Sequence, residues 1–205
     1  TILYEELWMK NLAIVYELLV RPSLGVRAAS EKRSIALVLW IILFFSASVS
    51  VADLLIFSSP GLTFSLISLT WGGIFYFFFA LIGLFLLSCI LHFIAEGLSG
   101  EGKVLNFFVA LGCSLLPGIL TAPLSLILSA IGSLSLKTAL YLISKMIIFY
   151  WVATLQILAI KEVYHLSSGR ALLTYLIPPL GILFLFSTLL ALLILTIVMG
   201  IIGVF

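Results

Sequence analysis

Two long stretches without a charged residue constrain this chain more than any other feature. Leu54–Ala95 and Ala171–Phe205 contain no Asp, Glu, Lys or Arg. A helix crosses the hydrocarbon core of a bilayer with about 20 apolar residues, so each stretch has room for a membrane span. Over all 205 residues 64% are apolar and 9% are charged, whereas a soluble domain has roughly 25% charged residues. The sequence therefore predicts an all-α polytopic membrane protein and excludes a soluble enzyme and a disulfide-stapled secreted module.

The apolar runs predict a bundle of five transmembrane helices. The turn signal Ser58-Ser59-Pro60-Gly61 ends the first run, because Pro and Gly together leave the helical pattern. We expect residues 62–70 to be an interfacial or re-entrant stretch. The expected spans are Ser34–Phe57, Trp71–Ala95, Val104–Ile131, Leu140–Ile160 and Pro178–Gly200.

The distribution of Lys and Arg predicts the orientation of these spans. Cytoplasmic loops are enriched in Lys and Arg. Eight of the ten fall before the first span or after the second and fourth, namely Lys10, Arg21, Arg27, Lys32, Arg33, Lys103, Lys161 and Arg170. We therefore expect a cytoplasmic amino terminus and an outside carboxyl terminus, in the cell membrane if the source is prokaryotic. Dividing residues 62–95 into two short spans would give six helices and destroy this asymmetry.

Residues 1–33 form a cytoplasmic amphipathic and basic segment before the transmembrane domain 34–205. On a helical wheel Glu6, Lys10 and Glu17 share a narrow arc, while Leu3, Leu7, Ile14 and Leu18 lie away from it. One interpretation is a helix on the inner membrane surface, with the basic residues 21–33 attracting anionic lipid. The other is a helix across the cytoplasmic mouth of the bundle. Charges interrupt the segment, so it is not a signal peptide.

Asp53 and Lys145 are the two charged residues placed within spans. Charges at membrane depth are functional candidates by default. The expected topology puts both in the outer leaflet, so we predict that they approach each other as an intramembrane charge pair. The alternative is that Lys145 extends to the headgroups and Asp53 is solvated separately.

The third span combines small residues with prolines. Ala110, Ser114, Gly118 and Ala122 recur every four residues, which marks a helix contact face in lipid. Pro117 and Pro123 each lack a backbone donor, and we expect both to interrupt the helix. Discontinuous helices line binding sites in many transporters, although packing alone also explains the small residues.

At the inner face the sequence offers a possible metal site. His92 and Glu96 are four residues apart, and Glu162 and His165 are three apart. Each spacing places a carboxylate and an imidazole on one helix face, as in helix-borne metal sites. If the two helix ends adjoin, the four residues could bind a divalent cation such as zinc or relay a proton. The alternative is a hydrogen-bonded cap, and no other cofactor is predicted.

No catalytic motif is present. The chain lacks GxxxxGK[ST], GxSxG, HExxH and a dinucleotide-binding fingerprint, and the glycine-rich run 96–102 opens no Walker pattern. Cys89 and Cys113 have no CxxC partner. The net charge of +2 is too small to imply nucleic acid as a partner. We therefore expect no enzymatic activity.

Several short runs lie in and around the loop between the second and third spans and after the fourth. They are ILHFIAEGLSGEGK at 90–103, LGCSLLP at 111–117, YW at 150–151 and IKEVYHLSSGRA at 160–171, with Arg21-Pro22 before the first span. These runs resemble the Yip (Ypt-interacting protein) family in its prokaryotic form. The family often has an aromatic residue where Cys113 stands. The resemblance implies five transmembrane helices and a cytoplasmic amino terminus. Its eukaryotic members are linked to vesicle trafficking and Rab-type GTPases, but a segment of about 33 residues offers little surface for such a partner.

These features favour a non-enzymatic membrane scaffold or adaptor of the Yip type, in membrane organisation or trafficking. The partners we expect are membrane lipids, other membrane or peripheral proteins, or a second copy of the chain in a homo-oligomer. The alternative is a small transporter or ion or metal pathway past Asp53, Lys145 and the interrupted third span.

Overall fold

The computed structural model describes residues 2–57 and 66–202, with side chains for residues 11–57 and 67–198. The regular elements in this part of the chain are all helices, and five stretches in it are long and apolar enough to cross a membrane. The predicted all-α class with five spans is therefore confirmed. The helices are α1 (Ile2–Val20), α2 (Pro22–Lys32), α3 (Ile35–Phe57), α4 (Leu66–Gly97), α5 (Val104–Cys113), η1 (Leu116–Leu120, a 3₁₀ helix), α6 (Thr121–Ser129), α7 (Leu134–Tyr164) and α8 (Ser168–Ile202).

The amino-terminal helices form a hairpin at one end of the bundle. Ile14 and Leu18 of α1 are buried, and a side chain added at Gly25 of α2 would come 2.4 Å from the Leu18 backbone nitrogen. α2 packs in turn on α5 and α7. Both interpretations of α1, on the membrane surface or across the mouth of the bundle, stay predictions.

The central helix of the bundle is α3, which contacts α4, α5, α6 and η1. Its buried residues include Ser46, Ser48 and Ser50, whose small side chains allow neighbouring helices to come close. A side chain added at Gly112 of α5 would come 2.4 Å from a Val38 methyl group, and one at Gly118 would come 2.4 Å from the Phe45 ring. The third span thus packs directly on α3.

The third span is not one helix. It consists of α5, a turn, the 3₁₀ helix η1 and α6, so the predicted interruption at Pro117 is confirmed. Pro123 does not interrupt the chain, because it lies in the first turn of α6, where backbone N–H groups lack intrahelical partners in any case. The 3₁₀ turn also changes the helical register between Ser114 and Gly118, so the predicted small-residue stripe is not one continuous α-helical face.

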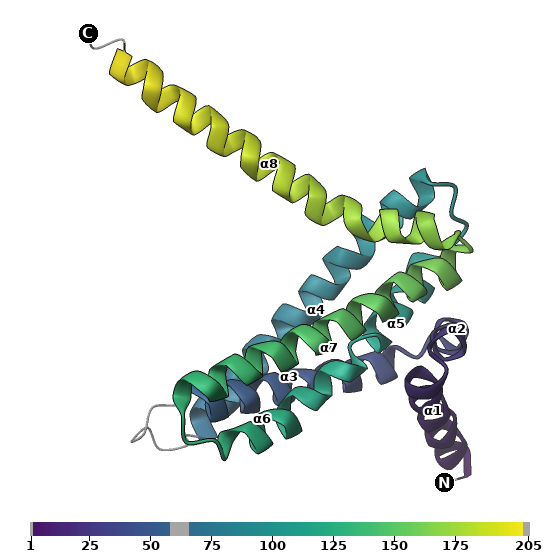
Figure 1. Cartoon of the computed structure of the whole chain (residues 1–205). Coiled ribbons are helices and arrows are strands. Elements are labelled where there is room, and N and C mark those ends of the chain that lie inside the picture. Colours follow the sequence, from purple (N-terminus) through teal and green to yellow (C-terminus); the bar gives the residue numbers. More distant parts are fainter. Residues whose placement is uncertain (1, 58–65, 203–205) are drawn as a thin grey trace.

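The last span begins earlier than predicted. We expected it to start at Pro178, but α8 runs unbroken from Ser168 through Pro178 and Pro179. Helices in lipid tolerate proline, because local adjustments satisfy the freed backbone groups. The first turns of α8 are held through the buried Ala171 and Thr174, and residues 179–198 are exposed all round. Figure 1 shows this part of α8 leaving the bundle as a separate arm.

Two further boundaries differ from the sequence-based expectation. α4 begins at Leu66, so the part of the expected interfacial stretch from Leu66 to Thr70 is helical. Residues 58–65 lie outside the described residues. α7 is also longer than predicted, starting at Leu134 after Ser133, whose side chain accepts a hydrogen bond from the Leu136 N–H.

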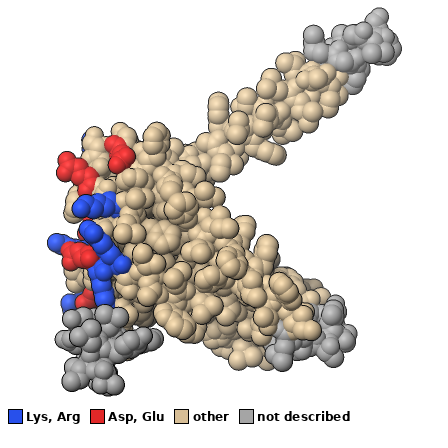
Figure 2. All heavy atoms as spheres, turned by 180° about the vertical axis from the view of Figure 1, so that it is seen from behind, with Lys and Arg blue, Asp and Glu red and all other residues tan. Residues whose placement is uncertain are grey.

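Apart from Asp53, Lys137 and Lys145, the described charged side chains gather at one end of the molecule. Figure 2 shows Lys, Arg, Asp and Glu along a single edge, from which the bundle and the α8 arm extend as uncharged surfaces in this view. This distribution matches what a membrane would impose on the chain, since charges are costly in hydrocarbon. Which end faces the cytoplasm stays a prediction.

We predict that Gly112→Ala destabilises the bundle, because the new methyl group would overlap Val38, which is fully buried. Overpacking of this kind costs about 1–3 kcal/mol. Thermal unfolding in detergent would measure the loss. The control is Gly83→Ala in α4, where no atom lies within 4 Å of the added carbon. Equal stability of the two variants would contradict the close packing of α5 on α3.

Candidate functional site

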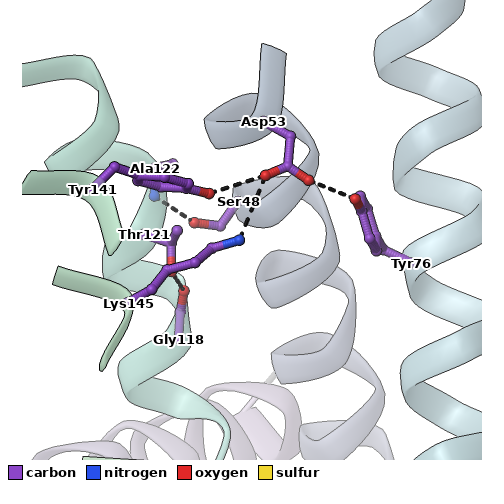
Figure 3. A network of polar contacts seen from close by, with 8 residues as sticks. All are labelled: Ser48, Asp53, Tyr76, Gly118, Thr121, Ala122, Tyr141 and Lys145. Atoms are coloured by element: carbon purple, nitrogen blue, oxygen red, sulfur yellow. Dashed lines mark hydrogen bonds and ion pairs between the residues drawn. The ribbon is translucent and has the colours of Figure 1, made fainter. Parts of the chain in front are cut away.

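Asp53 is the centre of a polar network that joins three helices. Its Oδ1 lies 3.5 Å from the Lys145 Nζ and accepts a hydrogen bond of 3.0 Å from the Tyr141 hydroxyl. Its Oδ2 accepts a hydrogen bond of 2.5 Å from the Tyr76 hydroxyl. Figure 3 shows the three partners converging on Asp53 from α4 and α7. The structure thus brings together the two charges that the sequence singled out.

The network neutralises charge in a partly solvated place. The side chains of Lys145 and Asp53 are 40% and 28% exposed. The Lys145 ammonium also lies 4.8 Å from the centre of the Tyr141 ring, where the ring face attracts a cation. Direct pairing offsets part of the cost of removing each ion from water. The alternative in which each charge is solvated separately is not what the structure shows.

The two tyrosines of this network were missed by the sequence analysis. Tyr76 and Tyr141 sit in the middle of apolar runs. A phenolic hydroxyl at that depth needs a hydrogen-bond partner, and Tyr141 precedes Lys145 by one helical turn. That spacing was a usable signal for Tyr141, whereas the sequence contains no comparable signal linking Tyr76 to Asp53.

A second group of polar contacts lies at the break in the third span. The Ser48 hydroxyl of α3 donates to the Ile119 carbonyl at 2.6 Å and accepts from the Ala122 N–H at 2.8 Å. The Thr121 hydroxyl donates to the Gly118 carbonyl at 2.7 Å. Pro117 and Gly118 are themselves buried. Backbone groups at the break are therefore satisfied by neighbouring protein (Figure 3), as a hydrocarbon environment requires.

At the charged end, His92 of α4 joins two partners. Its Nδ1 lies 2.6 Å from the Tyr164 hydroxyl, and its Nε2 lies 3.3 Å from a Glu96 carboxylate oxygen. A neutral imidazole with its proton on Nε2 fits both contacts, donating to Glu96 and accepting from Tyr164. This His92–Tyr164 cluster connects the carboxyl-terminal ends of α4 and α7.

The four-residue metal site suggested by the sequence is not formed. No group of three or more His, Cys, Asp and Glu side chains among the described residues is placed to hold an ion. The reason lies at the end of α7. The helix stops at Tyr164, and His165 takes a left-handed cap conformation with φ 54°, so the helical spacing from Glu162 does not continue to it. His92 and Glu96 come together, but Tyr164 is the partner that reaches them.

Tyr164 is fixed by the glycine-rich loop. A side chain at Gly102 would come 2.5 Å from the Tyr164 ring, and one at Gly100 would come 2.9 Å from its Cβ. The Phe107 ring of α5 meets Tyr164 edge-on at 5.2 Å. The loop glycines therefore allow the backbone to approach the tyrosine closely, which is a structural role rather than a phosphate cradle.

The comparisons with known proteins agree with this architecture. The sequence model of the Yip1 domain matches residues 16–191. The chain belongs to the Yip1 domain family. The match covers α2 to α7, most of α8 and the end of α1, so it includes both polar clusters of this Yip1-domain protein. No curated protein and no solved structure matches the chain.

We expect Asp53 and Lys145 to be energetically coupled. In a double-mutant cycle, Asp53→Asn combined with Lys145→Met should give a coupling of about 1 kcal/mol, because each single variant removes a partner from the other. Denaturant unfolding in mixed micelles would measure it. Thr154→Val on the same helix is the matched control, since the Thr154 hydroxyl bonds only its own helix at Tyr150. A coupling as small as that of the control would contradict the network.

We expect Tyr164→Phe to cost about 1 kcal/mol of stability, because it removes the hydrogen bond to His92 while keeping the ring. Tyr150→Phe in the same helix is the control, as Tyr150 is 76% exposed. Thermal unfolding of the two purified variants beside the parent protein is the measurement. A Tyr164→Phe protein as stable as Tyr150→Phe would show that the His92–Tyr164 cluster does not hold α4 to α7.

Proposed function

We propose that this Yip1-domain protein is a non-enzymatic membrane scaffold or adaptor that organises lipids and partner proteins around a closed helical bundle. The observation that carries the proposal is that side chains of α3 occupy the break in the third span. Ser48 bonds the Ile119 carbonyl and the Ala122 N–H at the break, and the Phe45 ring lies against Gly118. A transport site needs polar groups available to a substrate, and here those groups bind neighbouring protein.

The α8 arm supports a role in holding partners. Its residues 179–198 make an apolar helix that is exposed all round, whereas its first turns pack on α4 and α7. Such a helix can be covered by lipid, by a span of another membrane protein or by a second copy of the chain. A scaffold of this kind presents a span to its surroundings and keeps its own polar contacts inside the bundle.

A small transporter is the second candidate, and one observation favours it. The Lys145 side chain is 40% exposed and forms a salt bridge with Asp53, so an ion could reach the pair from the outer side. For either role we propose the orientation derived from the cations, with the amino terminus in the cytoplasm and the carboxyl terminus outside. The gathering of charge at one end supports this orientation (Figure 2).

A flux assay separates the two candidates. The protein and its Lys145→Met variant would be reconstituted into liposomes and assayed for movement of protons and divalent cations. We expect the flux from both to equal that of protein-free liposomes, because the break in the third span is closed. A flux carried by the parent protein and lost in Lys145→Met would overturn the scaffold proposal and establish the transport pathway.

A further inference from the structure

One face of α1 is apolar and has no cover in the fold. Ile14 and Leu18 are buried against α2, but Leu12, Tyr16, Leu19 and Val20 on the other side are 61%, 66%, 46% and 55% exposed. Ala13 is exposed beside them. We call these five residues the α1 outer face. The predicted apolar residues Ile14 and Leu18 therefore face protein, and a second apolar face takes the outward position.

Polar groups border this face at its two ends and along one side, where the partly exposed Glu17 follows Tyr16. The Asn11 side-chain oxygen accepts a hydrogen bond of 2.6 Å from the Lys32 Nζ, which brings a cation to the amino-terminal end of the face. Arg21 follows Val20 directly and is exposed. An apolar strip bounded by cations matches the layered chemistry of a bilayer surface, where acyl chains lie beneath phosphates.

The position of α1 points to the same surface. α1 lies at the charged end of the molecule and runs across the direction of α3 (Figure 1). The position of α1 relative to the spans is fixed by α2. Gly25 brings α2 into backbone contact with Leu18, and α2 packs on α5 and α7. The spans cross the membrane, so a helix across their charged ends lies parallel to the membrane surface.

We propose that the α1 outer face inserts into the headgroup layer of the membrane that holds the spans, with Arg21 bound to lipid phosphate. Tyr16 sits at the middle of the face, and tyrosine is enriched at this depth of a bilayer. Burial of the four larger side chains supplies the binding free energy. The lipid at the span ends is continuous with the lipid that covers the bundle, which makes it the occupant nearest to this face.

The test measures the depth of single spin labels in liposomes. In a background with Cys89→Ser and Cys113→Ala, labels are placed by Tyr16→Cys and Leu19→Cys on the face, and by Glu31→Cys on α2 as the control. The Glu31 side chain is 66% exposed. We expect both face labels to collide with oxygen several-fold more, and with a water-soluble nickel chelate several-fold less, than the control label.

Lipid composition then tests the role of Arg21. In liposomes containing phosphatidylglycerol the face labels should lie deeper than in pure phosphatidylcholine, and Arg21→Gln should remove that difference. Nickel collision at Tyr16→Cys equal to that at Glu31→Cys would overturn the proposal. Protection of the face labels from both oxygen and nickel would also overturn it, because it would show a protein on the face. The spans hold every variant in the membrane, so the result is independent of the flux assay.

Discussion

The rule that polar groups in hydrocarbon must find partners within the protein governs this structure. The third span breaks at Pro117. Beside this break, the Ile119 carbonyl and the Ala122 N–H both find their partner in the Ser48 hydroxyl of α3. Because one hydroxyl donates and accepts at once, a small side chain can serve both ends of the break. The same smallness lets the two helices approach closely. In the described part, Ser46 Oγ and Asn106 Oδ1 are the buried side-chain atoms without a hydrogen-bond partner.

Polar side chains follow the same rule at the two ends of the bundle. At one end Asp53 of α3 receives two tyrosine hydroxyls and one ammonium group. At the other end His92 of α4 accepts a hydrogen bond from the Tyr164 hydroxyl. α7 takes part at both ends, with Tyr141 and Tyr164 separated by most of its length. These contacts fix α7 relative to α3 and α4, so sliding α7 along its axis would break contacts at both ends together.

The sequence was sufficient for properties that depend on burial in lipid and insufficient for those that depend on local backbone detail. Uncharged runs of sufficient length identify spans whatever their packing. The two charges within spans, Asp53 and Lys145, lie together as expected, because pairing offsets part of the cost of removing each from water. The start of α8 was misjudged because Pro178 and Pro179 are compatible with a helix in lipid. The four-residue metal site is not formed because His165 is a left-handed residue that ends α7 directly after Tyr164, so the helical spacing from Glu162 does not reach it. Spacing along a sequence cannot show such a cap.

Two surfaces on the outside of the molecule are left for contact with its surroundings. Asp53 and Ser48 are tied to neighbouring helices, while the α8 arm leaves the bundle (Figure 1) and one face of α1 is exposed. These two surfaces differ in kind. The arm is uncharged and belongs to a helix long enough to cross a bilayer, whereas the α1 face is short and followed directly by Arg21. On the proposal made above, such a chain would contact its surroundings at two depths, one within the hydrocarbon and one among the headgroups, and the bundle would set the distance between them.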